Sequence, residues 1–315
     1  MENIDENISC GIAIPQVFTE DPIDLDLIRK FASRAEDLGY DSLWVQERII
    51  GTADSLEPLN LLSYLAASTK SIRLGTAVII ATTRNPFLLA KELCTIDNLS
   101  KGRLTLGLAL GGRIATYPLL GAPREKRVRH FIEFLSVIKA LWTPGNASHH
   151  GEFWDFDNIK MRPLPVQETG PPIWFGGRHI AALKRAATMG DGWMGAGSTS
   201  TGEFREHVEV IRSELERIGK SESEFTISKR VYVAIDDDEE RAKARLSSWF
   251  GAHYGNADLS AHVSVWGSVA KCTEGIQEVV NSGAEMLMFN PVFDHMDHLE
   301  KLRYQIIPKL SYTLR

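Results

Sequence analysis

The chain has 315 residues, of which 43% are hydrophobic and 24% charged, a composition typical of a globular rather than a disordered protein. Its formal net charge of −6 argues against a broad nucleic-acid-binding face. No apolar run approaches the roughly 18 residues that a membrane span needs, and the acidic stretch 1–7 does not resemble a secretory signal. The cysteines are scattered, which indicates reduced thiols without a metal site (Cys10, Cys94 and Cys272). We therefore expect a cytoplasmic protein that binds neither nucleic acid nor membrane.

Short apolar runs alternate with amphipathic segments along the chain. We expect strands at about 8–14, 42–45, 72–80, 104–110, 172–175, 192–194, 225–235 and 285–289. Asp24 is placed to cap the first helix and Gly39 to end it, while Pro58 and Pro86 each suit a first helical turn. Later helices are expected at about 123–142, 179–189, 203–218, after 238, at 269–281 and up to about 307.

Eight strands, each followed by a helix, predict an α/β fold: a (β/α)8 TIM barrel with insertions, forming one domain over residues 1–315. A doubly wound open sheet is the alternative, because periodicity does not reveal closure. Two segments interrupt the rhythm. Residues 144–171 hold glycines, prolines and aromatics, and we interpret them as an excursion over one barrel mouth; residues 236–284 form a longer insertion.

Barrel enzymes place their chemistry on the loops after the strands, and several of these predicted loops are rich in glycine. Gly176, Gly177 and Arg178 directly precede a helix, whose N-terminal amides attract phosphate. The next such loop holds Gly195, Ala196 and Gly197. The alternative is that these glycines only form tight turns. Barrel phosphate sites usually follow the seventh and eighth strands, whereas these loops follow the fifth and sixth.

Four arginines stand at predicted strand ends of an otherwise acidic chain and indicate a cationic mouth for an anionic ligand (Arg48, Arg84, Arg113 and Arg178). Glu47 follows the second strand, where it would act as an acid or base, orient a ring nitrogen, or pair with Arg48. The stretch 294–298, DHMDH, resembles a metal cluster, but we interpret it as helix capping, and no metal site is predicted.

Three stretches together resemble the bacterial luciferase-like superfamily of flavin and deazaflavin oxidoreductases. They are AEDLGYDSLWVQERI at 35–49, IRLGTAVIIATTRNPFLLAKELCTIDNLSKGRLTLGLALGGR at 72–113 and PPIWFGGRHIAALKRAATMGDGWMGAG at 171–197. The resemblance implies a barrel that binds FMN or the deazaflavin coenzyme F420 across its mouth. It also implies that Ile80, Ala81 and Thr82 lie behind the ring, near a non-prolyl cis peptide at about 79–82, with Gly111 close by.

One departure from the family bears on the reaction. Deazaflavin alcohol dehydrogenases of this superfamily carry an Asp-His pair after the second strand, and here the pair reads Glu47-Arg48. Arginine stays protonated, so Arg48 cannot act as that base and would instead hold an anionic substrate or stabilise a peroxide or enolate oxygen. We take Glu47 and Arg48 as the candidate catalytic residues.

The resemblance implies an oxidoreductase or monooxygenase acting on a small organic substrate. It would pass hydride to or from F420, or activate O2 as a flavin hydroperoxide on reduced FMN. A separate flavin or F420 reductase is a possible partner. We favour F420 because its phosphate and carboxylate tail would use more of the predicted arginines. The family also suggests a homo-oligomer. The alternatives are a non-catalytic flavin-binding barrel and a redox-free phosphosugar-type lyase or isomerase.

Overall fold

The computed structural model describes residues 8–19, 22–51, 53–112 and 114–311. Eight parallel strands form a closed barrel, because each strand pairs with the next and β10 pairs with β7. The closure confirms the predicted TIM barrel and excludes the open sheet. The barrel strands are β1 (Ser9–Ala13), β3 (Ser42–Val45), β5 (Arg73–Thr76), β7 (Leu104–Ala109), β10 (Ile173–Gly176), β11 (Gly192–Gly195), β12 (Thr226–Ile235) and β14 (Met286–Pro291).

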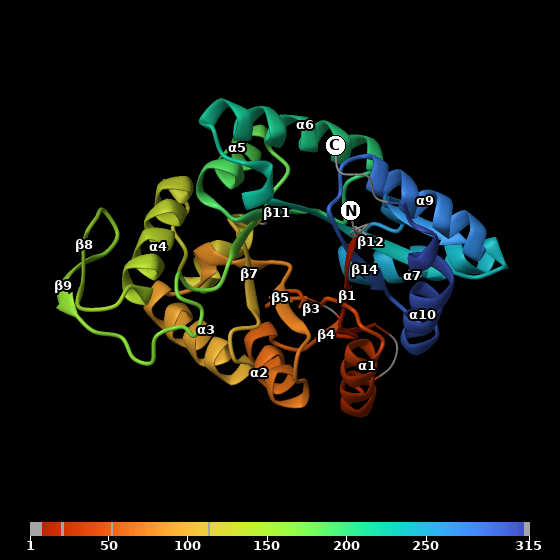
Figure 1. Ribbon diagram of the computed structural model, residues 1–315, viewed down its shortest axis with the longest axis horizontal. Coiled ribbons are helices and arrows are strands. Elements are labelled where there is room, and N and C mark those ends of the chain that lie inside the picture. Colours follow the sequence, from red (N-terminus) through yellow and green to blue (C-terminus); the bar gives the residue numbers. More distant parts are fainter. Residues whose placement is uncertain (1–7, 20–21, 52, 113, 312–315) are drawn as a thin grey trace, which may run out of the picture.

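Helices surround these strands on the outside (Figure 1). They are α1 (Leu25–Asp37), α2 (Pro58–Ser68), α3 (Pro86–Ser100), α4 (Arg127–Trp142), α5 (Ile180–Met189), α6 (Thr201–Ile218), α7 (Glu239–Tyr254), α8 (Leu259–Val263), α9 (Val269–Asn281) and α10 (His295–Lys301), which a π-helical turn at Leu302–Ile306 extends. Asp24 caps α1 through a hydrogen bond from Leu27 N, as the sequence predicts. In the described part of the chain, no helix is both long and apolar enough to cross a membrane.

One predicted helix starts later than expected. We predicted a helix from about 123, but α4 begins at Arg127, because Lys126 has a left-handed backbone with φ of 53°. That conformation cannot continue a right-handed helix, so the chain turns there before α4 begins.

The inside of the barrel is filled by large side chains facing small ones. Trp44 of β3 stacks on Trp174 of β10 with ring centroids 5.3 Å apart. Methionines from β11 and β14 complete this layer. Gly75 makes room for the indole, since a Cβ there would lie 2.3 Å from the Trp44 ring. The barrel is therefore a packed core rather than a pore, and ligand space is confined to its ends.

The predicted third strand, 72–80, divides into β5 and a shorter β6 (Ile79–Ile80). Thr76 Oγ1 both donates to Gly107 O and accepts from Gly107 N, at 2.8 Å each. This side chain takes the place of regular ladder bonds, and the Ala77–Val78 peptide that follows is cis. A non-prolyl cis peptide was expected at about 79–82, and it lies two residues earlier in the chain.

The excursion at 144–171 forms a hairpin of β8 (Ala147–His150) and β9 (Asp155–Ile159), but not over the barrel mouth. Figure 1 shows the hairpin at the edge of the molecule, beyond α4. The carboxylate of Glu133 in α4 accepts backbone N–H bonds from residues 152–154, and Lys91 of α3 donates to Arg162 O. The excursion therefore packs along the outer surface of α3 and α4.

The insertion at 236–284 adds α7, α8 and β13 (Ser264–Gly267), and β13 pairs with β12 outside the closed barrel path. Asp238 caps α7 with a hydrogen bond from Arg241 N, in agreement with the sequence. The description of residues 1–315 as a single domain stays a prediction.

Candidate functional site

Arg230 of β12 lies at the centre of the barrel mouth and is only 7% exposed. Its guanidinium donates to Asn290 Oδ1 of β14 at 2.7 Å and to Gln46 Oε1, after β3, at 2.5 Å. A longer contact of 3.5 Å reaches Ala77 O, the carbonyl of the cis peptide. The Tyr232 ring lies 4.9 Å from the same guanidinium. One buried cation therefore joins four strands of the mouth and forms its floor.

Glu47 has a fully buried side chain and supports the segment after β5. Its carboxylate accepts from Ile80 N at 2.5 Å and from Arg84 Nε at 2.7 Å. Burial raises the pKa of Glu47, an effect that Arg84 opposes. The predicted partner was Arg48, and that alternative is wrong, because the ion pair joins Glu47 to Arg84. Glu57 adds a second carboxylate on Arg84, at 2.7 Å.

Arg48 points toward α7 instead. It donates to His253 O, and its Nη1 lies 3.2 Å from His253 Nδ1. Beside this contact, the hydroxyl groups of Tyr232 and Tyr254 are 2.5 Å apart, and Trp249 stacks on His253 with centroids 4.5 Å apart. The end of α7 thus brings an aromatic wall from the insertion to the loop that carries Arg48.

Ile80, Ala81 and Thr82 lie at the mouth, where a short 3-10 turn follows β6. Ala81 and Thr82 are buried, and Thr82 Oγ1 donates to Leu110 O at 2.9 Å. This bond ties the turn to the end of β7, just before Gly111. Gly111 has a φ of 80° and accepts a bond from Arg127 Nη2 at 2.8 Å. The segment after the third strand is thus fixed against the fourth.

Gly176 and Gly177 form a turn that leaves no room for side chains. A Cβ on Gly176 would lie 3.1 Å from both methyl groups of Val78, and one on Gly177 would lie 2.9 Å from Ala182 Cβ. Gly177 also has a φ of 148°, which L side chains rarely adopt. Trp193 Nε1 donates to Gly177 O at 2.8 Å and so fixes the turn. The turn leads into α5, whose N-terminus can bind an anion.

The loop from Gly195 to Gly197 leads in the same way into α6. A Cβ on Gly197 would lie 2.6 Å from the Tyr232 ring, so the loop backbone packs directly on the floor of the mouth. A hydrogen bond from the Ser200 amide lowers the pKa of Glu203, and the charge of Arg178 lowers it further. Arg178 therefore lies near the start of α6. The two glycine loops follow neighbouring strands, β10 and β11.

The predicted ring of four arginines is wrong in part. Arg84 is neutralised by two carboxylates and is unavailable to a ligand. Arg113 lies outside the described residues, and Arg48 contacts α7. The buried cations of the mouth are instead Lys229 and Arg230, which sequence reasoning missed. Two adjacent basic residues inside the apolar run of the seventh strand were the available signal.

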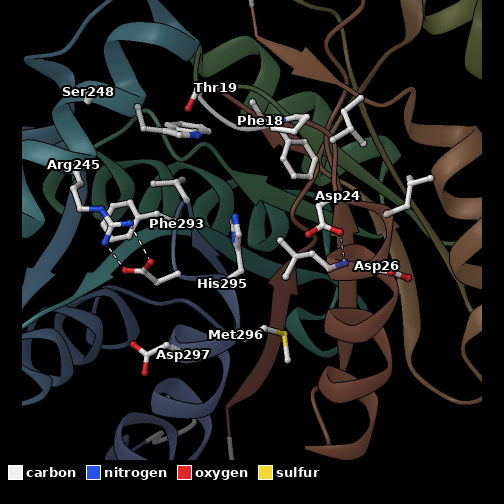
Figure 2. Close-up of a pocket in the computed structure, with 18 of the residues that line it drawn as sticks. Phe18, Thr19, Asp24, Asp26, Arg245, Ser248, Phe293, His295, Met296 and Asp297 are labelled. Atoms are coloured by element: carbon white, nitrogen blue, oxygen red, sulfur yellow. Dashed lines mark hydrogen bonds and ion pairs between the residues drawn. The ribbon is translucent and has the colours of Figure 1, made fainter.

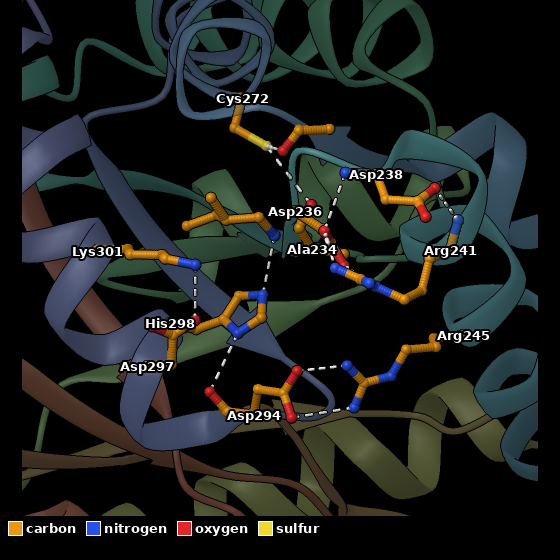
Figure 3. Close-up of polar contacts among 12 residues, drawn as sticks. Ala234, Asp236, Asp238, Arg241, Arg245, Cys272, Asp294, Asp297, His298 and Lys301 are labelled. Atoms are coloured by element: carbon orange, nitrogen blue, oxygen red, sulfur yellow. Dashed lines mark hydrogen bonds and ion pairs between the residues drawn. The ribbon is translucent and has the colours of Figure 1, made fainter.

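A pocket of about 1510 Å³ lies between the loop after β1, α7 and the start of α10 (Figure 2). Phe293 and His295 face it, and Arg245 pairs there with Asp294. His298 is buried and accepts from Ile235 N at 2.9 Å, while its Nδ1 lies 3.1 Å from Asp294 O (Figure 3). Both ring nitrogens are engaged. Among the described residues, no group suited to a metal ion occurs.

The chain matches known proteins over most of its length. The luciferase-like monooxygenase family matches residues 9–286. FMNH2-dependent dimethylsulfone monooxygenase of Pseudomonas putida is 29% identical over 247 residues, which cover 76% of this chain and 67% of that protein. F420-dependent glucose-6-phosphate dehydrogenase of Kineococcus radiotolerans is 26% identical over 233 residues, covering 70% and 67%.

Among solved structures, an F420-dependent secondary alcohol dehydrogenase in complex with an F420-acetone adduct has a similar fold. It superposes with a TM-score of 0.83 over 97% of this chain and 99% of that one, at 18% identity. Because the family match spans the barrel from β1 to the start of β14, this chain belongs to the luciferase-like monooxygenase family.

Proposed function

We propose that the chain is an oxidoreductase that binds a flavin or deazaflavin coenzyme at the barrel mouth and acts on a small organic substrate. The observation that carries the proposal is the pair of glycine loops at the starts of α5 and α6, beside two buried cations. Backbone amides at helix starts favour phosphate, and both coenzymes carry one. The relatives named as FMNH2-dependent and F420-dependent support a coenzyme of one of these two kinds.

The residues present fit such a group. Gly176, Gly177 and Gly197 lie in tight turns, because a Cβ at each would meet Val78, Ala182 or Tyr232. We propose that these turns, with Arg178, Gly195 and Ala196, hold the phosphate. The ring would then lie toward the segment of Ile80, Ala81, Thr82 and Gly111. When bound, the coenzyme would supply hydride transfer or oxygen activation, and the protein would supply binding and orientation.

The chain's own residues have distinct roles in this proposal. Arg230 presents a fixed positive charge at the floor of the mouth, where it would stabilise negative charge on a ligand. Arg48 cannot take a proton from a substrate, so we propose that it holds an anionic substrate group. Glu47 positions the Ile80 amide and Arg84. We propose it as a support for the site, since its carboxylate is fully buried.

The choice between FMN and F420 stays open. The preference for F420 depends on four arginines that bind its anionic tail. Glu47 and Glu57 neutralise Arg84, so fewer arginines support that preference. If the reaction consumes the reduced coenzyme, a separate reductase would supply it. Self-association into a homo-oligomer and a cytoplasmic location remain predictions.

The test is a calorimetric titration of the apoprotein with FMN, reduced FMN and F420, followed by turnover assays with the coenzyme that binds. We expect one coenzyme to bind with a stoichiometry of one and to be oxidised or reduced with substrate. Failure to bind any of the three would overturn the proposal and favour the redox-free lyase or isomerase. Tight binding without turnover over a broad substrate panel would favour the non-catalytic barrel.

A further inference from the structure

Lys229 is a buried lysine beside the mouth, on β12 next to Arg230. It is 2% exposed, so its ammonium group must find its partners inside the protein. The Nζ atom donates to Ala196 O at 2.5 Å, to Thr199 O at 2.8 Å and to Thr199 Oγ1 at 2.9 Å. It also lies 5.6 Å from the centre of the Phe204 ring. All three of these hydrogen bonds go to the loop between β11 and α6.

These bonds determine which way the loop faces. The carbonyl groups of Ala196 and Thr199 turn inward to Lys229, and Thr199 Oγ1 also donates to Ala196 O at 2.8 Å. Carbonyl groups turned toward a cation inside the protein are kept away from a ligand at the mouth. A loop held in this way presents its glycine backbone to an anion, while the amides of Ser200 and Glu203 at the start of α6 are engaged in the capping box.

The acceptors of the Lys229 ammonium group are carbonyl and hydroxyl oxygens, so these hydrogen bonds do not balance its charge with a carboxylate. The acid whose charge acts on Lys229 is Glu203, and its Oε2 accepts a hydrogen bond from the Ser200 amide at 2.7 Å, as part of the cap of α6. Arg230 adds a second positive charge on the same strand. An anion that binds close to Lys229 would therefore stabilise its buried positive charge.

We propose that Lys229 is a positioning residue that holds the 195–199 loop in its phosphate-binding form, and that the bound coenzyme phosphate balances its buried charge. This inference rests on the proposed function, because it requires a coenzyme phosphate at the mouth. It predicts that the contribution of Lys229 to affinity depends on the phosphate and not on the ring.

The inference includes a dependence on pH. Burial lowers the pKa of Lys229 to about 7, with Arg230 adding to the effect and Glu203 opposing it. A bound phosphate favours the charged lysine and raises that pKa, so affinity falls as pH rises above 7. The other titratable groups near this region are Arg178, Glu203, Glu206, His207 and Tyr232. Burial lowers the pKa of His207 below its ordinary value and raises the pKa of Tyr232 well above its own. The second pKa of a phosphate monoester is about 6, so neither His207 nor the phosphate titrates between pH 7 and 9.

The experiment compares ligands that differ only by the phosphate: FMN against riboflavin, and the 5′-phosphate of the deazaflavin alcohol against the alcohol itself. Dissociation constants are measured at pH 7 and pH 9 for the wild type, Lys229→Met and Lys229→Arg. We expect Lys229→Met to weaken the phosphate-bearing ligand at least tenfold and its phosphate-free partner less than threefold. We expect wild-type affinity for the phosphate-bearing ligand to fall at least fivefold between pH 7 and 9.

Lys229→Arg keeps the charge and does not titrate, so it should retain affinity within about fivefold of the wild type at pH 7 and lose the pH dependence. This variant tests the inference even if Lys229→Met does not fold. Lys220→Met is the matched control, because Lys220 Nζ also bonds a backbone carbonyl, Gly190 O at 2.5 Å, and lies 5.1 Å from an aromatic ring, that of Phe225. That carbonyl precedes β11, at the opposite end of the barrel.

The outcomes separate the two claims. If the wild type binds neither FMN nor F420, the proposed function fails. If the wild type binds one of them, but Lys229→Met weakens both members of the ligand pair equally or neither, the role of Lys229 is refuted and the proposed function stands. An unchanged pH dependence in Lys229→Arg would also refute it.

Discussion

Replacing Glu47 by glutamine tests whether this buried carboxylate holds the site together. The change keeps the side-chain size and an acceptor for Ile80 N, but it removes the charge that faces Arg84. Breaking a buried ion pair from one side costs about 3–5 kcal/mol. We expect the low end, about 3 kcal/mol, because Arg84 is 16% exposed and keeps Glu57. At about 2 °C per kcal/mol, a value suited to chains of this size, the melting temperature falls by about 6 °C.

Glu57→Gln is the matched control, since Glu57 binds the same guanidinium from a side chain that is 39% exposed. Exposed pairs contribute about 0–1 kcal/mol, so its melting temperature should fall by no more than about 2 °C. Differential scanning calorimetry of both variants at neutral pH measures the difference. Equal melting temperatures for Glu47→Gln and Glu57→Gln would refute the supporting role of Glu47.

Three further predictions concern other parts of the molecule. Burial raises the pKa of each cysteine to about 12, so a thiol reagent at pH 8 should label none in the folded protein and three after unfolding (Cys10, Cys94 and Cys272). Burial lowers the pKa of His298, so its contribution to stability is complete above its ordinary value of 6.5 and is lost as pH falls through the lowered pKa. The free energy of unfolding, measured with urea, should therefore fall less between pH 7 and pH 5 in His298→Gln than in the wild type. Equal losses in the two proteins would contradict this. Arg230→Lys cannot reproduce the forked bonds to Gln46 and Asn290, so turnover should fall at least tenfold in a folded protein, and unchanged turnover would exclude that role.

Much of the fold was predictable because local signals agreed with the barrel. Asp24, Pro58 and Gly102 mark helix ends, and apolar strands covered by helices read as continuous apolar runs. The interruption of the third strand was not predictable, since it depends on Thr76 bonding across to Gly107. The position of the 144–171 hairpin was also beyond the sequence, because it depends on bonds to α3 and α4.

The loops of the candidate site could be located from the sequence, whereas the pairing of its charges could not. The glycine turns after the fifth and sixth strands were visible because helix starts follow them directly. Which arginines face a ligand could not be predicted, since partners of Arg84 such as Glu57 come from elsewhere in the chain. Lys229 and Arg230 were missed because candidate site residues were sought only on the loops after the strands, whereas both lie within β12. A basic pair in a buried strand needs buried partners, and that requirement points to a site.

The most direct measurement is the affinity of the coenzyme for a Gly176→Ala/Gly177→Ala double variant. The two Cβ atoms would meet Val78 at 3.1 Å and Ala182 at 2.9 Å, which deforms the turn. Gly112→Ala is the control, because it is also a strand-end glycine and its Cβ would meet nothing within 4 Å. We predict that the control binds like the wild type and that the folded double variant loses at least thirtyfold in affinity. Unchanged affinity in a folded double variant would contradict the account.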